Sequence, residues 1–172
     1  MPDIRKATVE DAPIIALLGR ITFNETFGHL FKDKNDLLAY HERTFSVAKI
    51  EGSLQDQENV FWIAFRDNLP IGYAKLKLNS PSEFIGSDSV CQLQKIYVLK
   101  DFLSLKVGLQ LQETLLKEAR ERNYKTIWLS VLQGNDWAIG FYEKNDFKNI
   151  GVHHFQIGKE VFRFNAMARE LL

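Results

Sequence analysis

The segment 94–109 combines residue types and a spacing that suit the binding of a phosphate group. A strand-like run ends at Val98, a loop of about seven residues follows, and a helix begins near Gly108. The first turn of a helix leaves backbone N–H groups without partners, and these donors point together at an anion. Gly108 permits close approach of a ligand, and Ser104 and Lys106 add a hydroxyl group and a positive charge. The segment predicts a pyrophosphate site, although a single glycine is also typical of an ordinary strand–helix loop.

A second segment, 135–147, reads NDWAIGFYEKNDF and follows another strand-like run. It resembles the stretch N-x-x-A-x-x-F-Y-x-K-x-G-F of the GNAT superfamily of N-acetyltransferases, and Ala138, Phe141 and Tyr142 match in register. Asp146 stands in place of the glycine, and Asp tolerates the left-handed conformation that a helix end favours. Packing of a short helix is enough to explain Phe141, whereas the place of Tyr142 in the motif favours a functional role.

The resemblance extends over essentially the whole chain. Residues 4–12, IRKATVEDA, are similar to the opening IRxATxxDA of many GNAT proteins. The acetyl-CoA loop of the superfamily, Q/R-x-x-G-x-G/A, corresponds here to Leu103, Lys106 and Gly108, of which Gly108 alone matches. Within the superfamily, the segments 94–98 and 135–138 look most like the PaiA-type bacterial spermidine/spermine acetyltransferases.

The resemblance implies transfer of an acetyl group from acetyl-CoA to a primary amine by direct attack in a ternary complex. It implies that Tyr142 donates a proton to the leaving thiolate and that the backbone N–H of Val98 polarises the thioester oxygen. It further implies that the acetyl-CoA site comprises Ile96, Tyr97, Val98, Leu103, Ser104, Leu105, Lys106, Val107, Gly108, Asn135 and Lys144.

The general base is not evident from the motifs. Many relatives place a glutamate near the start of the strand where Gln92 and Gln94 stand, and neither amide can accept a proton. An ordered water leading to a more distant side chain would serve instead. Glu25, His29 and His41 are the candidates for that side chain.

Metal and thiol chemistry are disfavoured by the composition. Cys91 is the one cysteine, so neither an internal disulfide nor a thiolate zinc cluster can form, and we expect it to be a small buried apolar residue. His153 and His154 are adjacent on a strand, where side chains point to opposite faces, and they make a poor metal pair. We therefore expect no metal.

The net charge of the chain and its distribution disfavour some classes of binding partner. Lys plus Arg and Asp plus Glu both number 22, which argues against a dedicated nucleic-acid or membrane-surface binder. Residues 1–60 carry a net charge of −3 and residues 61–172 one of +3. This asymmetry suits polyanionic CoA and a small cationic amine such as a polyamine, although it is equally typical of an ordinary solvated surface. No signal peptide or membrane-length apolar run is present, so we expect a cytoplasmic protein.

These residues must be positioned by one domain, 1–172, of the α/β class. The pattern of apolar residues predicts a first helix that begins after Thr8. Predicted strands are 4–7, 60–65, 71–78, 91–98, 126–132, 147–155 and 160–168, and further helices are 35–45, 47–57, 107–122 and 135–144. The strand–helix–strand unit implies a parallel pair, and the hairpins imply antiparallel neighbours. Together with the resemblance, this predicts a GNAT-like mixed, mostly antiparallel sheet with a splayed central parallel strand pair and helices on both faces.

Three further expectations concern partners and alternatives. A loop over 24–34 that includes Phe27 and Phe31 either forms a wall of an acceptor pocket or caps the core. An exposed strand edge at 161–164 predicts pairing in a homodimer. A non-catalytic acyl-CoA sensor and an acetyltransferase of protein N-termini or lysines are the alternative functions. Tyr142 argues against the sensor, and the bulky aromatic segment 23–31 argues against an open groove for a protein.

Overall fold

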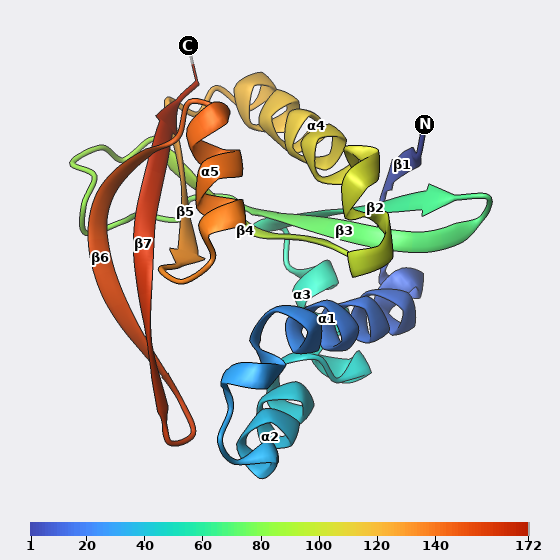
Figure 1. The fold of residues 1–172 in the computed structure, drawn as a ribbon. Helices are drawn as coiled ribbons and strands as arrows, with labels where there is room; N and C mark the ends of the chain where they lie inside the picture. Colours follow the sequence, from blue (N-terminus) through green and yellow to red (C-terminus); the bar gives the residue numbers. More distant parts are fainter. Residues whose placement is uncertain (172) are drawn as a thin grey trace.

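Alternating apolar residues build one seven-stranded mixed sheet in the computed structural model, which describes residues 1–171. The strands lie in the order β1-β2-β3-β4-β5-β7-β6 (Figure 1). Their bounds are β1 Asp3–Lys6, β2 Asn59–Arg66, β3 Leu69–Lys77, β4 Val90–Val98, β5 Thr126–Leu132, β6 Lys148–Ile157 and β7 Glu160–Glu170. This confirms the predicted mixed, mostly antiparallel sheet.

Helices cover both faces of the sheet, as predicted. On one face lie α1 to α3, and on the other lie α4 and α5 (Figure 1). Their bounds are α1 Ala12–Phe27, α2 Lys34–Thr44, α3 Val47–Gln55, α4 Val107–Glu121 and α5 Asp136–Lys144, with the 3-10 helices η1 Val9–Asp11, η2 Gly28–Leu30 and η3 Lys100–Leu105. Within residues 1–171, no helix has both the length and the apolar character needed to cross a membrane.

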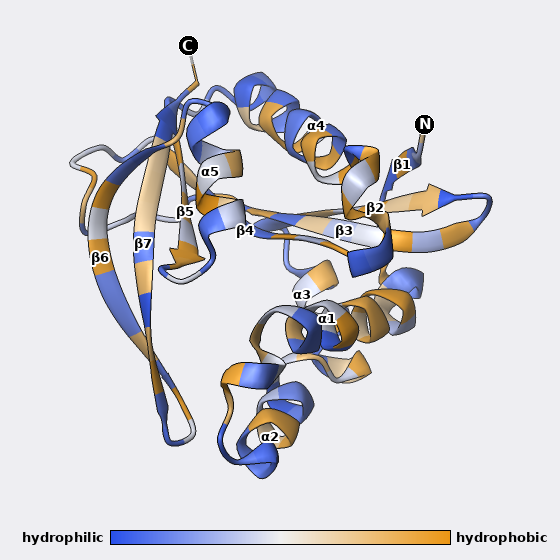
Figure 2. Ribbon diagram, viewed as in Figure 1, coloured by the Kyte–Doolittle hydropathy of each residue, from blue (hydrophilic) through white to orange (hydrophobic). Residues whose placement is uncertain are grey.

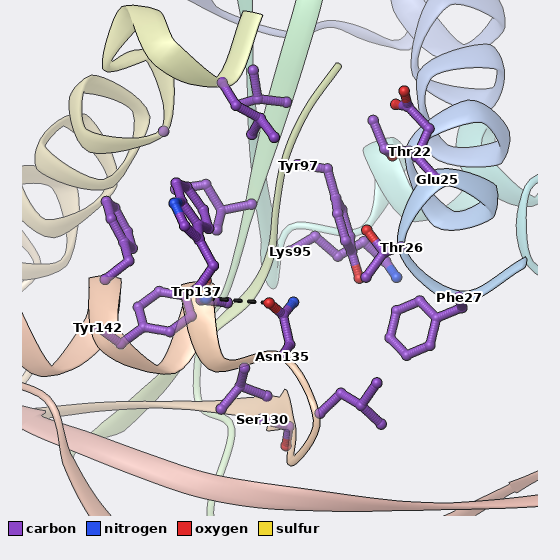
Figure 3. A pocket seen from close by; sticks show the side chains of 18 of the residues that line it. Thr22, Glu25, Thr26, Phe27, Lys95, Tyr97, Ser130, Asn135, Trp137 and Tyr142 are labelled. Carbon is purple, nitrogen blue, oxygen red and sulfur yellow. Dashed lines mark hydrogen bonds between the residues drawn. The ribbon is translucent and has the colours of Figure 1, made fainter. Parts of the chain in front are cut away.

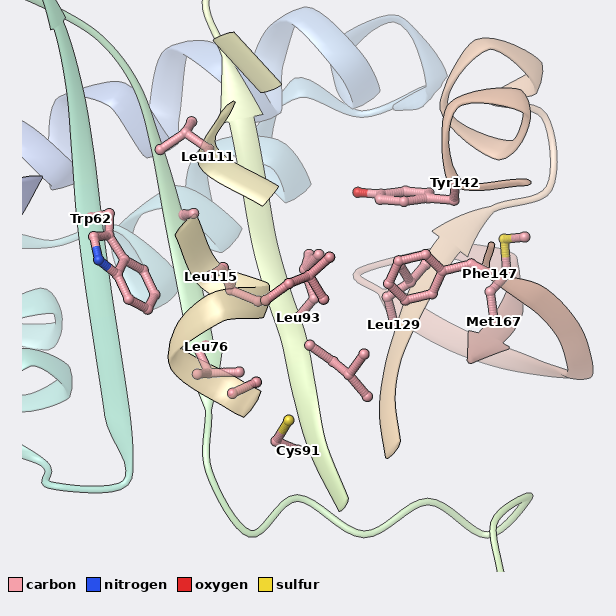
Figure 4. Close-up of a cluster of buried hydrophobic side chains, with 14 of the residues drawn as sticks. Trp62, Leu76, Cys91, Leu93, Leu111, Leu115, Leu129, Tyr142, Phe147 and Met167 are labelled. Carbon is pink, nitrogen blue, oxygen red and sulfur yellow. The ribbon is translucent and has the colours of Figure 1, made fainter. Parts of the chain in front are cut away.

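Each face has its own hydrophobic cluster. Hydrophobic residues run along β2, β3 and α1 and alternate with hydrophilic ones along α4 (Figure 2). Between the sheet and α4, Leu111 and Leu115 pack with Leu93, Leu129 and Phe147 (Figure 4). Between the sheet and α1 to α3, an aromatic-rich cluster contains Phe23, Phe27, Phe31, Phe45, Phe61, Tyr73 and Phe162. The sheet therefore forms the shared wall of both cores.

The central parallel pair opens along its length. β4 pairs with β5 over Val90–Thr126, Cys91–Ile127 and Gln92–Trp128. Beyond Gln92, β4 continues beside β3 to Val98, and β5 continues beside β7 to Leu132. The edges of β4 and β5 that face each other beyond Gln92 therefore lack a strand partner in the described sheet, which confirms the predicted splayed pair.

A β-bulge in β4 changes which side chains face α1. Leu76 pairs with Leu93 and Lys75 pairs with Lys95, so Gln94 is an extra residue in β4. Strict alternation would place residue 95 on the same face as Leu93, which packs in the α4 cluster. Because of the bulge, Lys95 and Tyr97 instead lie on the α1 face, where the Nζ atom of Lys95 is 5.2 Å from the ring centroid of Phe45.

One prediction about local structure is wrong, and one about a strand edge stays open. Residues 24–27 continue α1 rather than begin a loop, because Phe23 and Phe27 stack with ring centroids 4.5 Å apart and extend its apolar side. Residues 161–164 lie in β7 and pair with β6 on one side, whereas the register with β5 on the other side ends at Leu132–Phe164, so residues 161–163 have no strand partner there among the described residues. The outer strands of the sheet are β1 and β6, and the homodimer stays a prediction.

Candidate active site

A cavity of about 820 Å³ lies where β4 and β5 separate. Its lining comes from α1, β4, the start of α4, β5 and α5, and Figure 3 shows α1 on one side of β4 and α5 on the other. Residues that we predicted for the site and that line this cavity are Glu25, His29, Gln94, Ile96, Tyr97, Val98, Leu103, Lys106, Gly108, Asn135, Tyr142 and Lys144. The fold thus brings segments from both ends and the middle of the chain into one space.

The start of α4 provides the anion-binding end of the cavity. Lys106 is the N-cap residue and adopts a left-handed conformation, φ 57° and ψ 24°, at the place where the family motif has glycine. Its side chain does not cap the helix, so the first backbone N–H groups of α4 stay available to a ligand. A Cβ atom on Gly108 would meet no heavy atom closer than 4.0 Å, which means that the cavity begins directly at its backbone.

The unpaired edge of β4 provides backbone groups along the middle of the cavity. The N–H of Leu99 donates to the carbonyl oxygen of Ile71 on β3, at 2.9 Å. Successive residues of a strand point their N–H groups to opposite sides, so those of Val98 and Ile96 point to the opening toward β5. An extended chain in this opening would therefore find donors at the spacing of a strand.

Helix α5 contributes polar groups at the opposite wall. The Oδ1 atom of Asn135 accepts a hydrogen bond from the backbone N–H of Ala138 at 3.1 Å and so caps α5 (Figure 3). Tyr142 is buried among Phe141 and Phe147, and burial followed by the nearby Tyr97 raises the pKa of its hydroxyl group. Tyr142 therefore keeps its proton at neutral pH and is able to donate it.

The α1 end of the cavity carries the remaining titratable groups. Glu25 accepts a hydrogen bond from the backbone N–H of Lys100 at 3.2 Å. His29 also lines the cavity, whereas His41 does not, because it is buried against Phe23 and Phe45. Of the three candidates for a remote base, the structure brings Glu25 and His29 to the cavity.

Three residues predicted to bind acetyl-CoA do not line the cavity, namely Ser104, Leu105 and Val107. Val107 is fully buried in the α4 core, because it is the first apolar residue of the helix face that meets the sheet. Cys91 is also fully buried, as expected, and burial raises the pKa of its thiol to about 12. Gln92 lies outside the cavity, where its side-chain oxygen accepts a hydrogen bond from Ser80 at 2.9 Å.

Sequence reasoning missed Lys95, Thr26 and Trp137, which also line the cavity. The bulge in β4 turns Lys95 toward the face of the sheet that α1 covers, and no residue type in the sequence marks this bulge. Thr26 was assigned to a loop, although α1 continues through it. Trp137 is 64% exposed and stacks on Phe141 with ring centroids 5.9 Å apart, and the spacing of these two aromatic residues by four positions was the signal available in the sequence.

Comparisons with known proteins agree with this geometry. Residues 22–147 match the model of the acetyltransferase (GNAT) family. An uncharacterized N-acetyltransferase from Lactobacillus delbrueckii subsp. lactis is 26% identical over 159 residues, which cover 91% of this chain and 90% of that protein. The crystal structure of PaiA N-acetyltransferase from Thermoplasma acidophilum in complex with coenzyme A covers 99% of both chains, with a TM-score of 0.78 and 20% identity. The ribosomal-protein-S18-alanine N-acetyltransferase from Escherichia coli covers 99% of this chain and 94% of its own, with a TM-score of 0.73 and 18% identity.

The chain belongs to the acetyltransferase (GNAT) family. It is an acetyl-CoA-dependent N-acetyltransferase, and acetyl-CoA is its cosubstrate. The cavity fits that cosubstrate in two respects, since it joins an uncapped helix start to an unpaired strand edge. Among residues 1–171, no group of three His, Cys, Asp or Glu side chains could hold a metal ion.

Proposed function

We propose that this protein acetylates a small primary amine, and that the amine attacks acetyl-CoA directly in the cavity between β4 and β5. The observation that carries the proposal is the separation of β4 from β5 beyond Gln92, with Tyr142 on one wall and Glu25 on the other. Acetyl-CoA supplies the acetyl group as a thioester. Alignment of the two reactants in one cavity is the main contribution to the rate.

In the proposed arrangement each wall has a separate task. The backbone N–H groups at the start of α4 and the side chain of Lys106 hold the phosphate end. The N–H groups of Ile96 and Val98 hold the extended arm, and that of Val98 also stabilises charge on the carbonyl oxygen. The free amide N–H₂ of Asn135 and the ammonium group of Lys144 add contacts from α5.

Proton transfer completes the proposed reaction. The amine loses a proton through water to Glu25, its nitrogen forms the bond to the carbonyl carbon, and the bond from carbon to sulfur breaks. Tyr142 gives its proton to the leaving thiolate, and its raised pKa means that the hydroxyl group is protonated before the thiolate forms. Glu25 is preferred to His29 because its hydrogen bond to the backbone of Lys100 fixes its position beside β4.

The acceptor is proposed to be small. The turn between β6 and β7 is tied to α2, because the backbone N–H of Lys159 donates to Asp36 at 2.9 Å and its ammonium group lies 3.1 Å from Asp33. This contact, together with the packing of Phe27 on Phe162 and Phe164, supports an α1 end of the cavity that is too narrow for a protein segment. A polyamine was favoured by the acidic residues of 1–60, but Glu25 alone among them lines the cavity. The proposal is therefore a primary amine without a requirement for further positive charge.

A test is release of CoA from acetyl-CoA in the presence of a panel of primary amines, with the N-acetyl product identified by mass. The test variant is Gly108→Phe, because its side chain would fill the cavity without meeting a core atom. The matched control is Gly52→Phe on α3, where the added side chain also meets open space. We expect turnover in the wild type and in Gly52→Phe, and none in Gly108→Phe. Acetyl-CoA binding without turnover of any amine would contradict a small acceptor and point instead to a protein N-terminus or lysine.

A further inference from the structure

Lys95 lies at the end of the cavity beside α1, which is the end proposed to hold the acceptor. The proposed reaction gives its ammonium group no role. Its Nζ atom lies 5.2 Å from the ring centroid of Phe45 and 5.8 Å from that of Tyr97. It forms no ion pair with any residue of 1–171 that the structure describes. A partly buried cation between aromatic rings and without a carboxylate is costly unless a ligand supplies the opposite charge.

The groups around Lys95 are also hydrogen-bond donors. Lys95, Thr26 and Tyr97 point into the same part of the cavity, between α1 and β4 (Figure 3). The carboxylate of Glu25 accepts a hydrogen bond from the backbone of Lys100, just beyond the end of β4. An ammonium group and two hydroxyl groups together match the acceptor oxygens of a carboxylate.

A second lysine adds to the positive potential on this face. Lys75 on β3 is the register partner of Lys95, and its Nζ atom lies 5.4 Å from the ring centroid of Phe61. Burial lowers the pKa of Lys95 to about 8, and burial together with Lys95 lowers that of Lys75 to about 7. A second ammonium group on the acceptor would meet repulsion here, whereas a carboxylate would be attracted.

We propose that Lys95, with Thr26 and Tyr97, binds a carboxylate of the acceptor, so that the substrate is a small amino carboxylate of the amino-acid type. This inference rests on the proposed function, because it assigns the acceptor of the same cavity. It gives a role to a lysine that the bulge in β4 turns toward α1. It makes Lys95 a residue that determines specificity rather than one that moves a proton.

The test uses pairs of amines that differ by one carboxylate: alanine and ethylamine, ornithine and putrescine, phenylalanine and phenethylamine. We expect the amino acid of at least one pair to be acetylated with a kcat/KM at least tenfold higher than its partner. In Lys95→Met we expect the KM for that amino acid to rise at least tenfold, with kcat within twofold of wild type. Lys77→Met, an exposed neighbour on β3, should behave as wild type.

A binding measurement separates failure of this inference from failure of the proposed function. Calorimetry of the wild-type protein with CoA bound should show that the N-acetyl amino acid binds at least tenfold tighter than the N-acetyl amine. In Lys95→Met the two products should bind with equal affinity. This preference requires no turnover, so it would stand if no amine were acetylated. Equal binding of the two products to wild type would overturn the inference. So would a loss of kcat in Lys95→Met at unchanged KM, since that result would assign Lys95 to proton transfer.

Discussion

At the scale of single residues, Lys106 shows how one position serves two requirements. Its left-handed backbone, φ 57°, costs a non-glycine residue roughly 1–2 kcal/mol, yet the loop before α4 has this geometry. The side chain that causes this cost also brings a positive charge to the end of the cavity proposed to hold phosphates. Glycine, which the family motif has at this place, would relieve the backbone and lose the charge.

A variant can separate these two effects. Asn adopts the left-handed conformation more readily than other non-glycine residues, so Lys106→Asn should preserve stability. We expect its affinity for acetyl-CoA to fall roughly 3- to 10-fold at low salt, and the difference to shrink at high salt, because the lost interaction is a screened charge. Calorimetry at two salt concentrations checks this, with Lys106→Arg as the control that keeps the charge. Equal affinity of Lys106→Asn and wild type at low salt would contradict the role of the side chain.

At the scale of elements, the turn between β6 and β7 fastens a long hairpin to α2. Gly158 has φ 60°, and a Cβ atom there would collide with Asp36. Gly158→Ala should therefore lower the free energy of unfolding by roughly 1–3 kcal/mol and raise the KM for the acceptor, because the part of β7 that includes Phe164, which lines the cavity, loosens. Affinity for acetyl-CoA should not change.

Denaturant unfolding and steady-state kinetics check this prediction. Gly52→Ala on α3 is the matched control, since the added methyl group meets open space there. The account of the closed acceptor end fails if Gly158→Ala destabilises the protein and leaves the KM for the acceptor unchanged.

Most of these elements could be predicted from the sequence. Strand 126–132 has the predicted bounds, and α2, α3, α4 and α5 lie within two residues of their predicted ends, because apolar spacing and caps mark them. The end of α1 was missed because Phe27 suits either a loop or a helix, and packing on Phe23 decides between them. The bulge at Gln94 was missed because strand alternation gives no sign of an extra residue, and it is the feature that places Lys95 in the cavity.

At the scale of the whole molecule, the two lysines on the α1 face connect function with stability. Lys75 has a pKa of about 7 in the folded protein and 10.5 as its reference value. Between about pH 7 and pH 10 the unfolded chain therefore binds more protons than the folded one, so this group makes the free energy of unfolding rise with pH. Below pH 7 the folded protein bears the full cost of the buried charge.

Lys75→Met removes this titration. We expect the variant to be more stable than wild type by at least about 1 kcal/mol at pH 6, with a smaller increase of stability from pH 7 to pH 10. Denaturant unfolding at several pH values measures both quantities, and exposed Lys77→Met should follow wild type. Unchanged stability of Lys75→Met at pH 6 would show that the charge of Lys75 is well solvated.

The parallel strand pair opens between two separately packed faces, and the cavity there is the proposed site of the reaction. The central proposal is that Tyr142 protonates the leaving thiolate. The most direct measurement is the rate of CoA release in Tyr142→Phe, which removes one hydroxyl group from a buried side chain. The control is Tyr124→Phe, whose hydroxyl group bonds to Asn79 away from the cavity. We expect kcat to fall by about 100-fold or more in Tyr142→Phe, with acetyl-CoA affinity unchanged, and to stay at the wild-type value in Tyr124→Phe. A kcat of Tyr142→Phe within a few-fold of wild type would contradict the claim.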